Sequence, residues 1–143
     1  MYRAIVRART RAVWRAISAH DADAPARLAT DDLRFTFVGD TPLGAQLVGR
    51  APFRAWLTDV FTRFDDITFD VLDVAVHGWP WHTRVAVRLA VNATLPDGAP
   101  YRNHACQWLT LRWGRMTEDW VLEDTVALAA ACAAQDGLGV SRG

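Results

Sequence analysis

Four long segments in the second half of the chain alternate apolar and polar residues, and this alternation constrains the fold more than any other feature. They are residues 67–77, 82–95, 101–113 and 115–124. A period of two is typical of β-strands with one buried face. The stretches "GWPW", "PDGAP" and "WG" between them are turn sequences, so we expect consecutive strands to be antiparallel neighbours.

The first half of the chain has the different periodicity of amphipathic helices. Apolar residues at helical spacing, with arginines between them, predict a first helix over residues 3–20, and Pro52 suits the first turn of a helix over 51–64. A short helix that ends near Thr30 and a strand, "LRFTFV", are expected between these two. The segment "TVALAAACAA" is expected to form a last helix.

Helices followed by a curled antiparallel sheet predict an α+β fold. We expect a cone-shaped α+β barrel, in which a curved antiparallel sheet of about four to six strands, a range set by ordinary sheet sizes, wraps over three N-terminal helices, with a short C-terminal helix. The cone is where a ligand is expected to bind. Residues 1–136 are expected to form a single domain, and residues 137–143 a flexible tail.

Composition narrows the classes of partner. The 16 basic and 16 acidic residues cancel without a long block of one sign, which argues against a nucleic-acid partner. The chain contains no lysine, so Schiff-base chemistry through a side-chain amine is excluded. Cys106 and Cys132 form no CxxC or metal-ligand pattern, and no apolar run is long enough for a membrane helix, so we expect a cytoplasmic protein with free thiols. The Ala- and Arg-rich composition is typical of GC-rich bacterial genomes.

Three segments resemble the SnoaL-like branch of the nuclear transport factor 2-like superfamily. They are "TPLGAQLVGRAPFRAWL", "YRNHACQWLTLRWGRM" and "DWVLEDTVAL", and with the order of elements the resemblance extends from about Arg7 to Leu128. It implies the cone-shaped fold just described. The superfamily includes polyketide cyclases, steroid isomerases, epoxide hydrolases and non-catalytic members, so the activity has to be argued from the site.

The last predicted strand carries four acids, and their orientation decides which of them faces the cone. Because Trp120 and Leu122 are the large apolar residues, we assign their face inward, together with Glu118 and Asp124. Asp119 and Glu123 then face outward, and Asp124 lies where desolvation would raise the pKa of a general base. The alternative is that Asp124 or Thr125 caps the following helix. The resemblance favours Asp124 as the acid, because SnoaL-like cyclases use an acid at this place in the last strand.

The preceding strand supplies the predicted polar partners of that acid. Its inward set is expected to contain Tyr101, Asn103, Ala105, Gln107, Leu109 and Leu111, with His104, Cys106, Trp108 and Thr110 on the outer face. Asn103 or Gln107 would then hold a developing enolate oxygen. The alternatives are that Asn103 only satisfies neighbouring backbone groups, or that a one-residue slip turns His104 inward.

Aromatic residues are expected to shape a pocket for a flat or hydrophobic molecule. The sequence contains seven tryptophans, and Trp14, Trp56 and Trp120 lie on elements that should border the cone, as does Phe37. Their alternative role is simply to fill the core. His77 and His82 flank a turn without a ligand pattern, so we predict no metal site and no cofactor.

The chain lacks the catalytic residues that the resemblance implies for two activities of the superfamily, steroid isomerisation and epoxide hydrolysis. Phe37 stands where the resemblance places the Asp of steroid isomerases, and "RLA" at Arg88 replaces the Arg-x-Asp pair of epoxide hydrolases. The remaining hypothesis is a SnoaL-like enzyme of the cyclase or isomerase type, with Asp124 transferring a proton next to a carbonyl. The alternatives are a non-catalytic binding module for a hydrophobic metabolite, or a structural homodimer formed through the outer sheet face that carries Trp108 and His104.

Overall fold

The computed structural model describes residues 1–142, with side chains described as far as Gly137. The chain forms four helices and six strands within this range. The helices are α1 (Tyr2–Ser18), α2 (Asp23–Leu28), α3 (Arg50–Arg63) and α4 (Thr125–Arg142). The strands are β1 (Ala29–Phe37), β2 (Ala45–Val48), β3 (Thr68–Trp79), β4 (His82–Thr94), β5 (Pro100–Arg112) and β6 (Arg115–Glu123).

The six strands form one curved sheet in the order β2-β1-β6-β5-β4-β3. The predicted α+β architecture and the antiparallel meander from β3 to β6 are confirmed. The expectation of a wholly antiparallel sheet is wrong, because β1 pairs with β6 in parallel. Residues 39–50, which are rich in Gly and turn residues and for which no strand was expected, contribute the short β2 antiparallel to β1.

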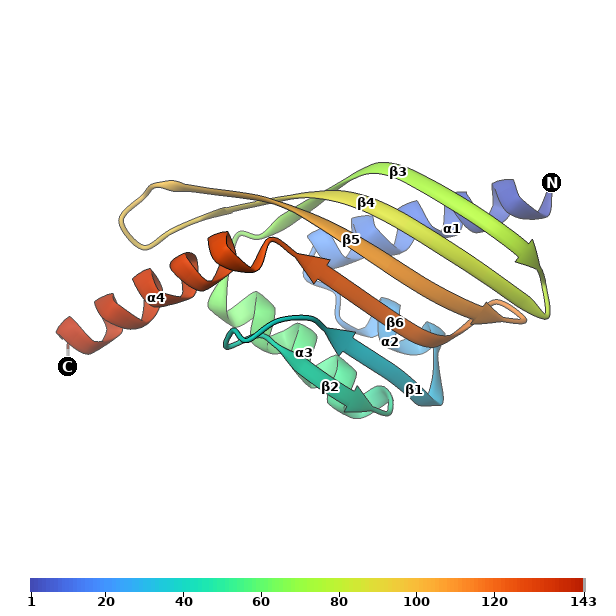
Figure 1. Ribbon diagram of the computed structural model, residues 1–143, viewed down its shortest axis with the longest axis horizontal. Helices are drawn as coiled ribbons and strands as arrows, with labels where there is room; N and C mark the ends of the chain where they lie inside the picture. The colour runs from blue at the N-terminus through green and yellow to red at the C-terminus, as the bar shows by residue number, and fades with distance from the viewer. Residues whose placement is uncertain (143) are drawn as a thin grey trace.

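The long helices cover the concave face of the sheet (Figure 1). In α1, the buried residues Val6, Thr10, Trp14 and Ile17 recur at helical spacing on one side, while the arginines between them are exposed. In α3, Phe53, Leu57 and Val60 do the same. α1 packs mainly on β3, whereas α3 packs on β1 and β2, so the two helices hold the two halves of the concave face.

Gly49 makes the sharp connection between β2 and α3. Its φ is 107°, a left-handed conformation that side chains with a Cβ rarely adopt. Its amide nitrogen donates to the Leu33 carbonyl of β1, so the turn also ties α3 to the sheet.

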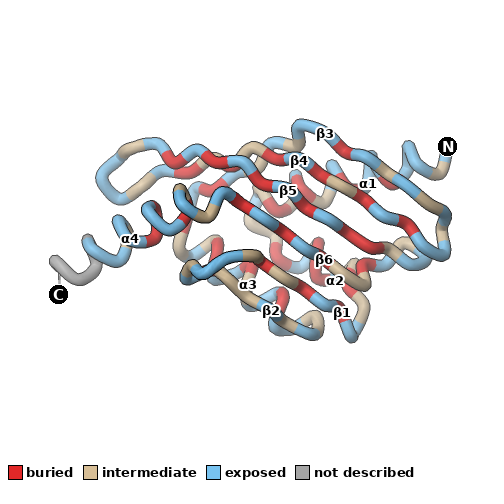
Figure 2. The backbone as a smooth tube through the Cα atoms, in the orientation of Figure 1, coloured by how far each residue is buried: buried red, intermediate tan, exposed pale blue. Residues whose placement is uncertain are grey.

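Burial alternates along the long strands as the sequence pattern predicts (Figure 2). In β5, Tyr101, Asn103, Ala105, Gln107 and Leu109 are buried, and His104, Cys106 and Trp108 are exposed. The predicted register of β5 is therefore confirmed through Leu109. Thr110, predicted to face outward, is buried, because a bulge shifts the β5–β6 register between Thr110 and Leu111.

α4 begins where the sequence predicts and points away from the sheet at the end opposite the N-terminus (Figure 1). It continues beyond the expected range of 125–134. The flexible tail predicted for 137–143 falls largely outside the residues whose side chains are described, and it stays a prediction. Within the described chain, none of the helices is long and apolar enough to cross a membrane.

Candidate functional site

A cavity of about 150 Å³ lies between the concave face of the sheet and the helices. Its walls are almost wholly apolar, and they come from α1, α2, α3 and the inner residues of the strands. The aromatic side chains that line it are Tyr2, Trp14, Phe35, Phe37, Phe53, Trp56, Phe61, Phe64, Phe69 and Tyr101. Two carboxylic acids also line it, Asp119 and Glu123.

The orientation of β6 decides which acids reach this cavity. Asp119, Val121 and Glu123 face inward and are 3%, 8% and 6% exposed. A bulge near Thr117 offsets the alternation, so that Met116 and Asp119, three residues apart, both point to the cavity. The predicted faces of β6 are therefore reversed.

Asp124 lies outside the cavity, so its predicted inward orientation is wrong. It is exposed, and its Oδ1 accepts hydrogen bonds from the backbone N–H groups of Val126 at 3.0 Å and Ala127 at 3.3 Å. These are free donors in the first turn of α4, so Asp124 is the N-cap of that helix. The structure therefore agrees with the alternative prediction that Asp124 caps the last helix.

Asp119 is enclosed by apolar neighbours on both sides. In the sheet it lies beside Phe35 of β1 and opposite Leu109 of β5. Burial among these groups penalises the charged carboxylate and raises the pKa of Asp119 to about 7, against a smaller opposing effect of its hydrogen bond with Gln107. At neutral pH this acid is therefore present in both protonation states.

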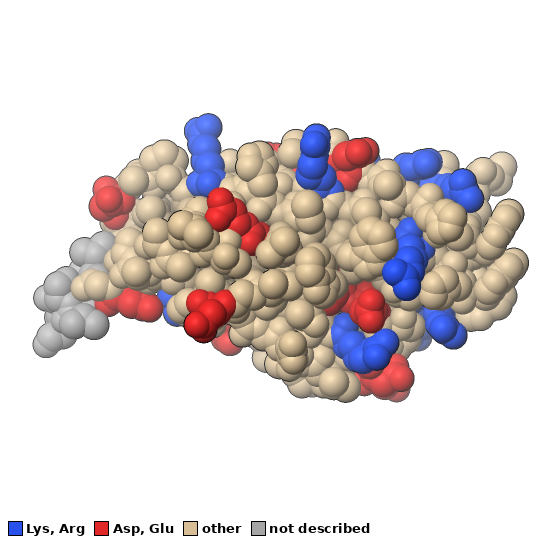
Figure 3. Space-filling model, viewed as in Figure 1, with Lys and Arg blue, Asp and Glu red and all other residues tan. Residues whose placement is uncertain are grey.

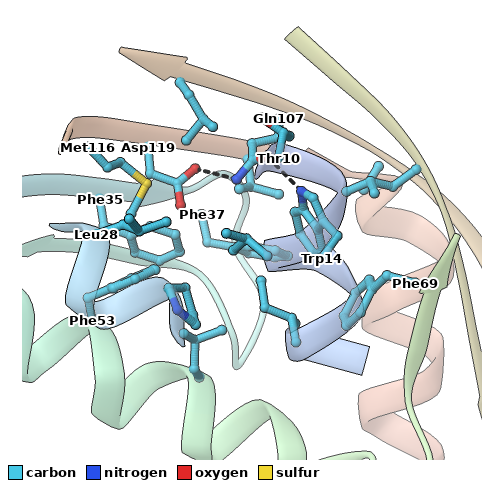
Figure 4. A pocket seen from close by; sticks show the side chains of 18 of the residues that line it. Thr10, Trp14, Leu28, Phe35, Phe37, Phe53, Phe69, Gln107, Met116 and Asp119 are labelled. Carbon is cyan, nitrogen blue, oxygen red and sulfur yellow. Dashed lines mark hydrogen bonds between the residues drawn. The ribbon is translucent and has the colours of Figure 1, made fainter. Parts of the chain in front are cut away.

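A chain of two hydrogen bonds orients Asp119 (Figure 4). The Trp14 Nε1–H donates to Gln107 Oε1 at 3.0 Å, and Gln107 Nε2–H donates to Asp119 Oδ1 at 3.1 Å. Because an indole N–H can only donate, it fixes which end of the Gln107 amide faces the acid. In the described part of the chain, the other carboxyl oxygen of Asp119, Oδ2, has no hydrogen-bond partner.

Gln107 reaches Asp119 because of the strand register. Gln107 pairs with Val121, two residues beyond Asp119, so the amide and the acid are diagonal neighbours on one face of the sheet. The predicted inward position of Gln107 is confirmed, and it lines the cavity. Its acid partner is Asp119, which the sequence reasoning had assigned to solvent.

Asn103 faces inward as predicted, but its amide is occupied by the protein itself. Its Nδ2 donates to the Tyr101 hydroxyl at 2.7 Å and to the Asp124 carbonyl at 3.0 Å, while its Oδ1 accepts from the His104 backbone N–H. Asn103 is not among the cavity-lining residues. This arrangement agrees with the alternative in which Asn103 satisfies neighbouring groups, so it is not available as the oxyanion donor.

Three of the four predicted aromatic binding residues line the cavity. Trp14, Phe37 and Trp56 do so, and the Trp56 indole N–H donates to the Leu43 carbonyl at 2.8 Å, which leaves its apolar ring for the wall. Trp120 does not line it. Its prediction is wrong because Trp120 is 38% exposed on the outer face of β6.

The outer face of the sheet carries an apolar group of its own. Trp108 and Trp120 are directly opposite each other on β5 and β6 and are 42% and 38% exposed, and Leu122 beside them is 40% exposed. We call these three residues the outer apolar patch. Figure 3, which views this side, shows few charged atoms over the middle of the sheet. His104 and Arg88 are also exposed, so neither contributes to the cavity.

One signal in the sequence would have placed the acids correctly. If Asp124 is fixed as the cap of a helix that starts at Thr125, its side chain has to turn back to that helix. The period of two then directs Glu123, Val121 and Asp119 to the opposite, inner face. The inward assignment was based instead on the large apolar residues Trp120 and Leu122.

The site consists of two acids, Asp119 and Glu123, and the amide of Gln107 in a largely apolar cavity. No group of three or more His, Cys, Asp or Glu side chains suited to a metal ion occurs among the described residues. The arrangement is able to accept or donate one proton at Asp119 beside an apolar ligand.

The profile of the SnoaL-like domain family matches residues 10–119. The chain belongs to the SnoaL-like family. The match extends from the second half of α1 to the middle of β6 and includes Trp14, Gln107 and Asp119. The resemblance inferred from the three sequence segments is thereby confirmed. No curated protein matches the chain.

Several solved structures share this fold. TerC, co-crystallised with polyporic acid, has a TM-score of 0.71 and 19% identity, with 84% of this chain and 92% of TerC covered. IdmH from Streptomyces antibioticus, a candidate polyketide cyclase, has a TM-score of 0.67 and 22% identity, with 87% and 93% covered. A candidate SnoaL-like polyketide cyclase from Jannaschia sp. CCS1 has a TM-score of 0.67 and 20% identity, with 80% and 79% covered. At these identities the likeness establishes the fold.

Proposed function

We propose that this chain is a SnoaL-like small-molecule enzyme of the cyclase or isomerase type, in which Asp119 transfers a proton next to a carbonyl group. The observation that carries the proposal is a buried acid, 3% exposed, on the wall of an apolar cavity and held by Gln107. Its pKa of about 7 suits an acid that removes and returns protons at neutral pH.

In this mechanism Asp119 Oδ2 removes the acidic proton from a carbon beside a carbonyl. Gln107 Nε2 has two N–H groups, of which one donates to Asp119. The second N–H is the donor that we assign to the enolate oxygen that forms. In a cyclase reaction the enolate carbon then attacks a second carbonyl of the same substrate, which forms a carbon–carbon bond and turns the oxygen of that carbonyl into an alkoxide. The protonated Asp119 returns its proton to this alkoxide or, in an isomerase reaction, to another carbon of the enolate. Every bond change takes place on the substrate and on one carboxyl oxygen.

The substrate is expected to be small or flat, and largely apolar. The cavity of about 150 Å³ is lined by aromatic and aliphatic side chains. A cavity of similar volume with an apolar lining is enough for a ligand the size of benzene. The co-crystal of TerC with polyporic acid supports a small-molecule role for this fold.

The test is hydrogen–deuterium exchange next to the carbonyl of aryl 1,3-dicarbonyl compounds, followed by NMR in deuterated water. We expect the wild-type protein to accelerate exchange, and Asp119→Asn to slow it by about 10² to 10⁴-fold, the range typical of a general base. Asp124→Asn is the matched control, because it makes the same chemical change at the exposed cap, and it should keep the wild-type rate.

Equal rates for wild type and Asp119→Asn on an accelerated compound would contradict the proposal. If the compounds bind in the cavity but none is exchanged faster than in buffer, the binding-module alternative is favoured.

We also propose that the protein forms a homodimer through the sheet. The outer apolar patch, formed by Trp108, Trp120 and Leu122, supports this, since exposed aromatic clusters are typical of protein interfaces. The Arg84 guanidinium lies over the Trp108 ring, 5.8 Å from its centroid, and arginine is also enriched at interfaces.

A further inference from the structure

Three exposed tryptophans lie together at one end of the sheet. Trp79 ends β3, Trp81 lies in the turn that follows and Trp113 lies in the β5–β6 turn, and the three are 60%, 56% and 71% exposed. The rings of Trp79 and Trp81 are stacked with centroids 6.0 Å apart, and the centroids of Trp81 and Trp113 are 6.4 Å apart. Tryptophan is usually mostly buried, and none of these three lines the cavity. We call them the tip cluster.

The two turns that carry the tip cluster are tied together. The Trp113 backbone N–H donates to the Pro80 carbonyl at 2.7 Å, so each hairpin end holds the other. Trp113 has a φ of 52°, a left-handed conformation that is uncommon for residues other than glycine, asparagine and aspartate. The three rings therefore form one apolar surface at the tips of two hairpins.

The N-terminal half of α1 lies beside the tip cluster (Figure 1). The Tyr2 hydroxyl is hydrogen-bonded to the Thr83 hydroxyl, and Thr83 donates to the Trp79 carbonyl at 2.7 Å. Further along the helix, the Arg9 guanidinium approaches Gly114, where a Cβ atom would lie 3.6 Å from Arg9 Nη1. The helix and the two turns thus form one end of the molecule.

This end of the molecule is basic. Residues 1–10, 77–82 and 110–116 contain no Asp or Glu, and their arginines are Arg3, Arg7, Arg9, Arg112 and Arg115. Within the described part of the chain, none of these five arginines forms an ion pair. Because the net charge of the whole chain is zero, the compensating acids lie elsewhere, and this end attracts an anionic partner.

The cavity opens at the same end. Of the described residues that line it, Ile5 and Arg9 are the only exposed ones, and both lie on the N-terminal half of α1. Gly114, which Arg9 approaches, also lines the cavity and directly follows Trp113. An apolar ligand that enters between α1 and the β5–β6 turn therefore passes the tip cluster.

The chemistry of this end fits the surface of an anionic bilayer. Tryptophan is enriched at membrane–water interfaces, where its ring is covered while the indole N–H stays hydrated. Arginines beside it are attracted to acidic lipid headgroups. Hairpin tips that project their rings can enter a fluid lipid surface, and such peripheral binding requires no membrane-spanning segment.

We propose that the tip cluster and its neighbouring arginines dock the protein on the surface of an anionic lipid bilayer, with the mouth of the cavity toward the lipid. An apolar substrate dissolved in the bilayer then enters the cavity directly from it. The docking is independent of the chemistry at Asp119, whereas this route for the substrate rests on the proposed function.

Co-sedimentation with vesicles tests the docking. We expect wild type to bind phosphatidylcholine vesicles that contain about 30% phosphatidylserine about tenfold or more tightly than vesicles of phosphatidylcholine alone. Added salt should weaken this binding. Trp81→Ser/Trp113→Asn should weaken binding to the mixed vesicles by about tenfold or more, and Arg112→Gln by about fivefold. Asparagine suits position 113 because it tolerates the left-handed backbone.

Val126→Ser and Arg102→Gln are the matched controls, because they change an exposed apolar residue and an exposed arginine away from the tips. Both should bind the mixed vesicles as wild type does. The inference is overturned if wild type does not bind the mixed vesicles, or if Trp81→Ser/Trp113→Asn binds them as tightly as wild type. If wild type ignores vesicles and the double variant loses self-association, the tip cluster contacts a second copy of the chain instead.

The exchange assay without vesicles separates this inference from the proposed function. Trp81→Ser/Trp113→Asn should keep the wild-type exchange rate, because neither residue lines the cavity. Asp119→Asn should keep the wild-type affinity for the mixed vesicles. Undiminished exchange in Asp119→Asn would refute the proposed function alone, and undiminished vesicle binding in the double variant would refute the docking alone.

Discussion

In an ordinary sheet the inner face is apolar and the outer face is polar, and in β6 this arrangement is reversed. The inner face carries two acids, Asp119 and Glu123, both at most 6% exposed. The outer face carries Trp120 and Leu122, which are 38% and 40% exposed. This part of the strand therefore buries two acids and exposes two large apolar side chains.

This inversion has a physical reason on each side. The inner face borders a cavity in which an ionisable group can meet a ligand, so its burial shifts its pKa into the range of proton transfer. The outer face is open in the monomer, and apolar residues there are covered only when another surface packs on them. The polarity of each face of a strand thus depends on what that face contacts. The inner face does not always contact an apolar core, and the outer face does not always contact water.

The largest effect expected from the difference between the two faces of β6 is a pH dependence of the free energy of unfolding. Both inner acids have a pKa of about 7 in the folded chain, above the unfolded values of 3.8 for Asp119 and 4.5 for Glu123. The folded chain binds more protons between these limits, so the free energy of unfolding falls as the pH rises through this window and levels off above about 7. We expect a loss on the order of 2 to 3 kcal/mol for each acid between about pH 5 and pH 8.

Urea unfolding at both pH values measures this loss. The double variant Asp119→Asn/Glu123→Gln should lose much less stability over the same interval, because neither side chain titrates. Equal slopes for wild type and the double variant would mean that the two acids are not desolvated.

The second effect concerns the outer face. We expect Trp120→Gln to raise the dissociation constant of the proposed homodimer by about 30-fold or more, as truncation of a central aromatic at an interface does. Sedimentation over a range of concentrations measures it. Trp79→Gln is a suitable control, because Trp79 is 60% exposed at a hairpin tip away from the patch. A wild-type protein that is monomeric at all concentrations would refute the role of the patch.

A smaller effect is expected at the end of β6. Asp124→Ala removes the acceptor for two N–H groups of α4 and should lower the free energy of unfolding by about 1 kcal/mol. Chemical denaturation at pH 8, where the inner acids are ionised, measures the change. Asp124→Ser retains a capping oxygen and should recover most of the loss. If Asp124→Ala instead abolished proton exchange on the carbonyl compounds, the assignment of the two aspartates would be reversed.

The smallest effect is expected at Glu118, the remaining acid of the strand. Its ion pair with Arg34 is 3.3 Å long, and the two side chains are 38% and 74% exposed. Glu118→Gln should therefore change stability by less than about 0.5 kcal/mol at moderate salt. If Glu118→Gln lowered the free energy of unfolding as much as Asp124→Ala does, the exposure of an acid on this strand would not predict its contribution to stability.

Much of the fold followed from the sequence, because periodicity reports local structure directly. The four long strands lie within a few residues of their predicted ranges, as do the helices that precede them. The parallel pairing of β1 with β6 was missed, since no local pattern reports which distant strand becomes a neighbour. β2 was missed because its four residues follow a run of turn residues.

The site was predicted only in part, and the difference lies in β6. Gln107 and the aromatic residues Trp14, Phe37 and Trp56 were identified because their elements bury one face against the helices. Asp119 and Glu123 were assigned to the outer face because the large apolar residues Trp120 and Leu122 were assigned inward, and only the tertiary cavity explains the reversed orientation.

The fixed amide of Gln107 has a stereochemical consequence. It occupies one oxygen of Asp119, so in the proposed mechanism a single oxygen, on the side of β6, is left to take and return the proton. A proton taken from one face of a planar enolate is then returned to the same face. Reactions in this cavity should be suprafacial, and a deuterium label removed from the substrate should reappear in the product on the side from which it left.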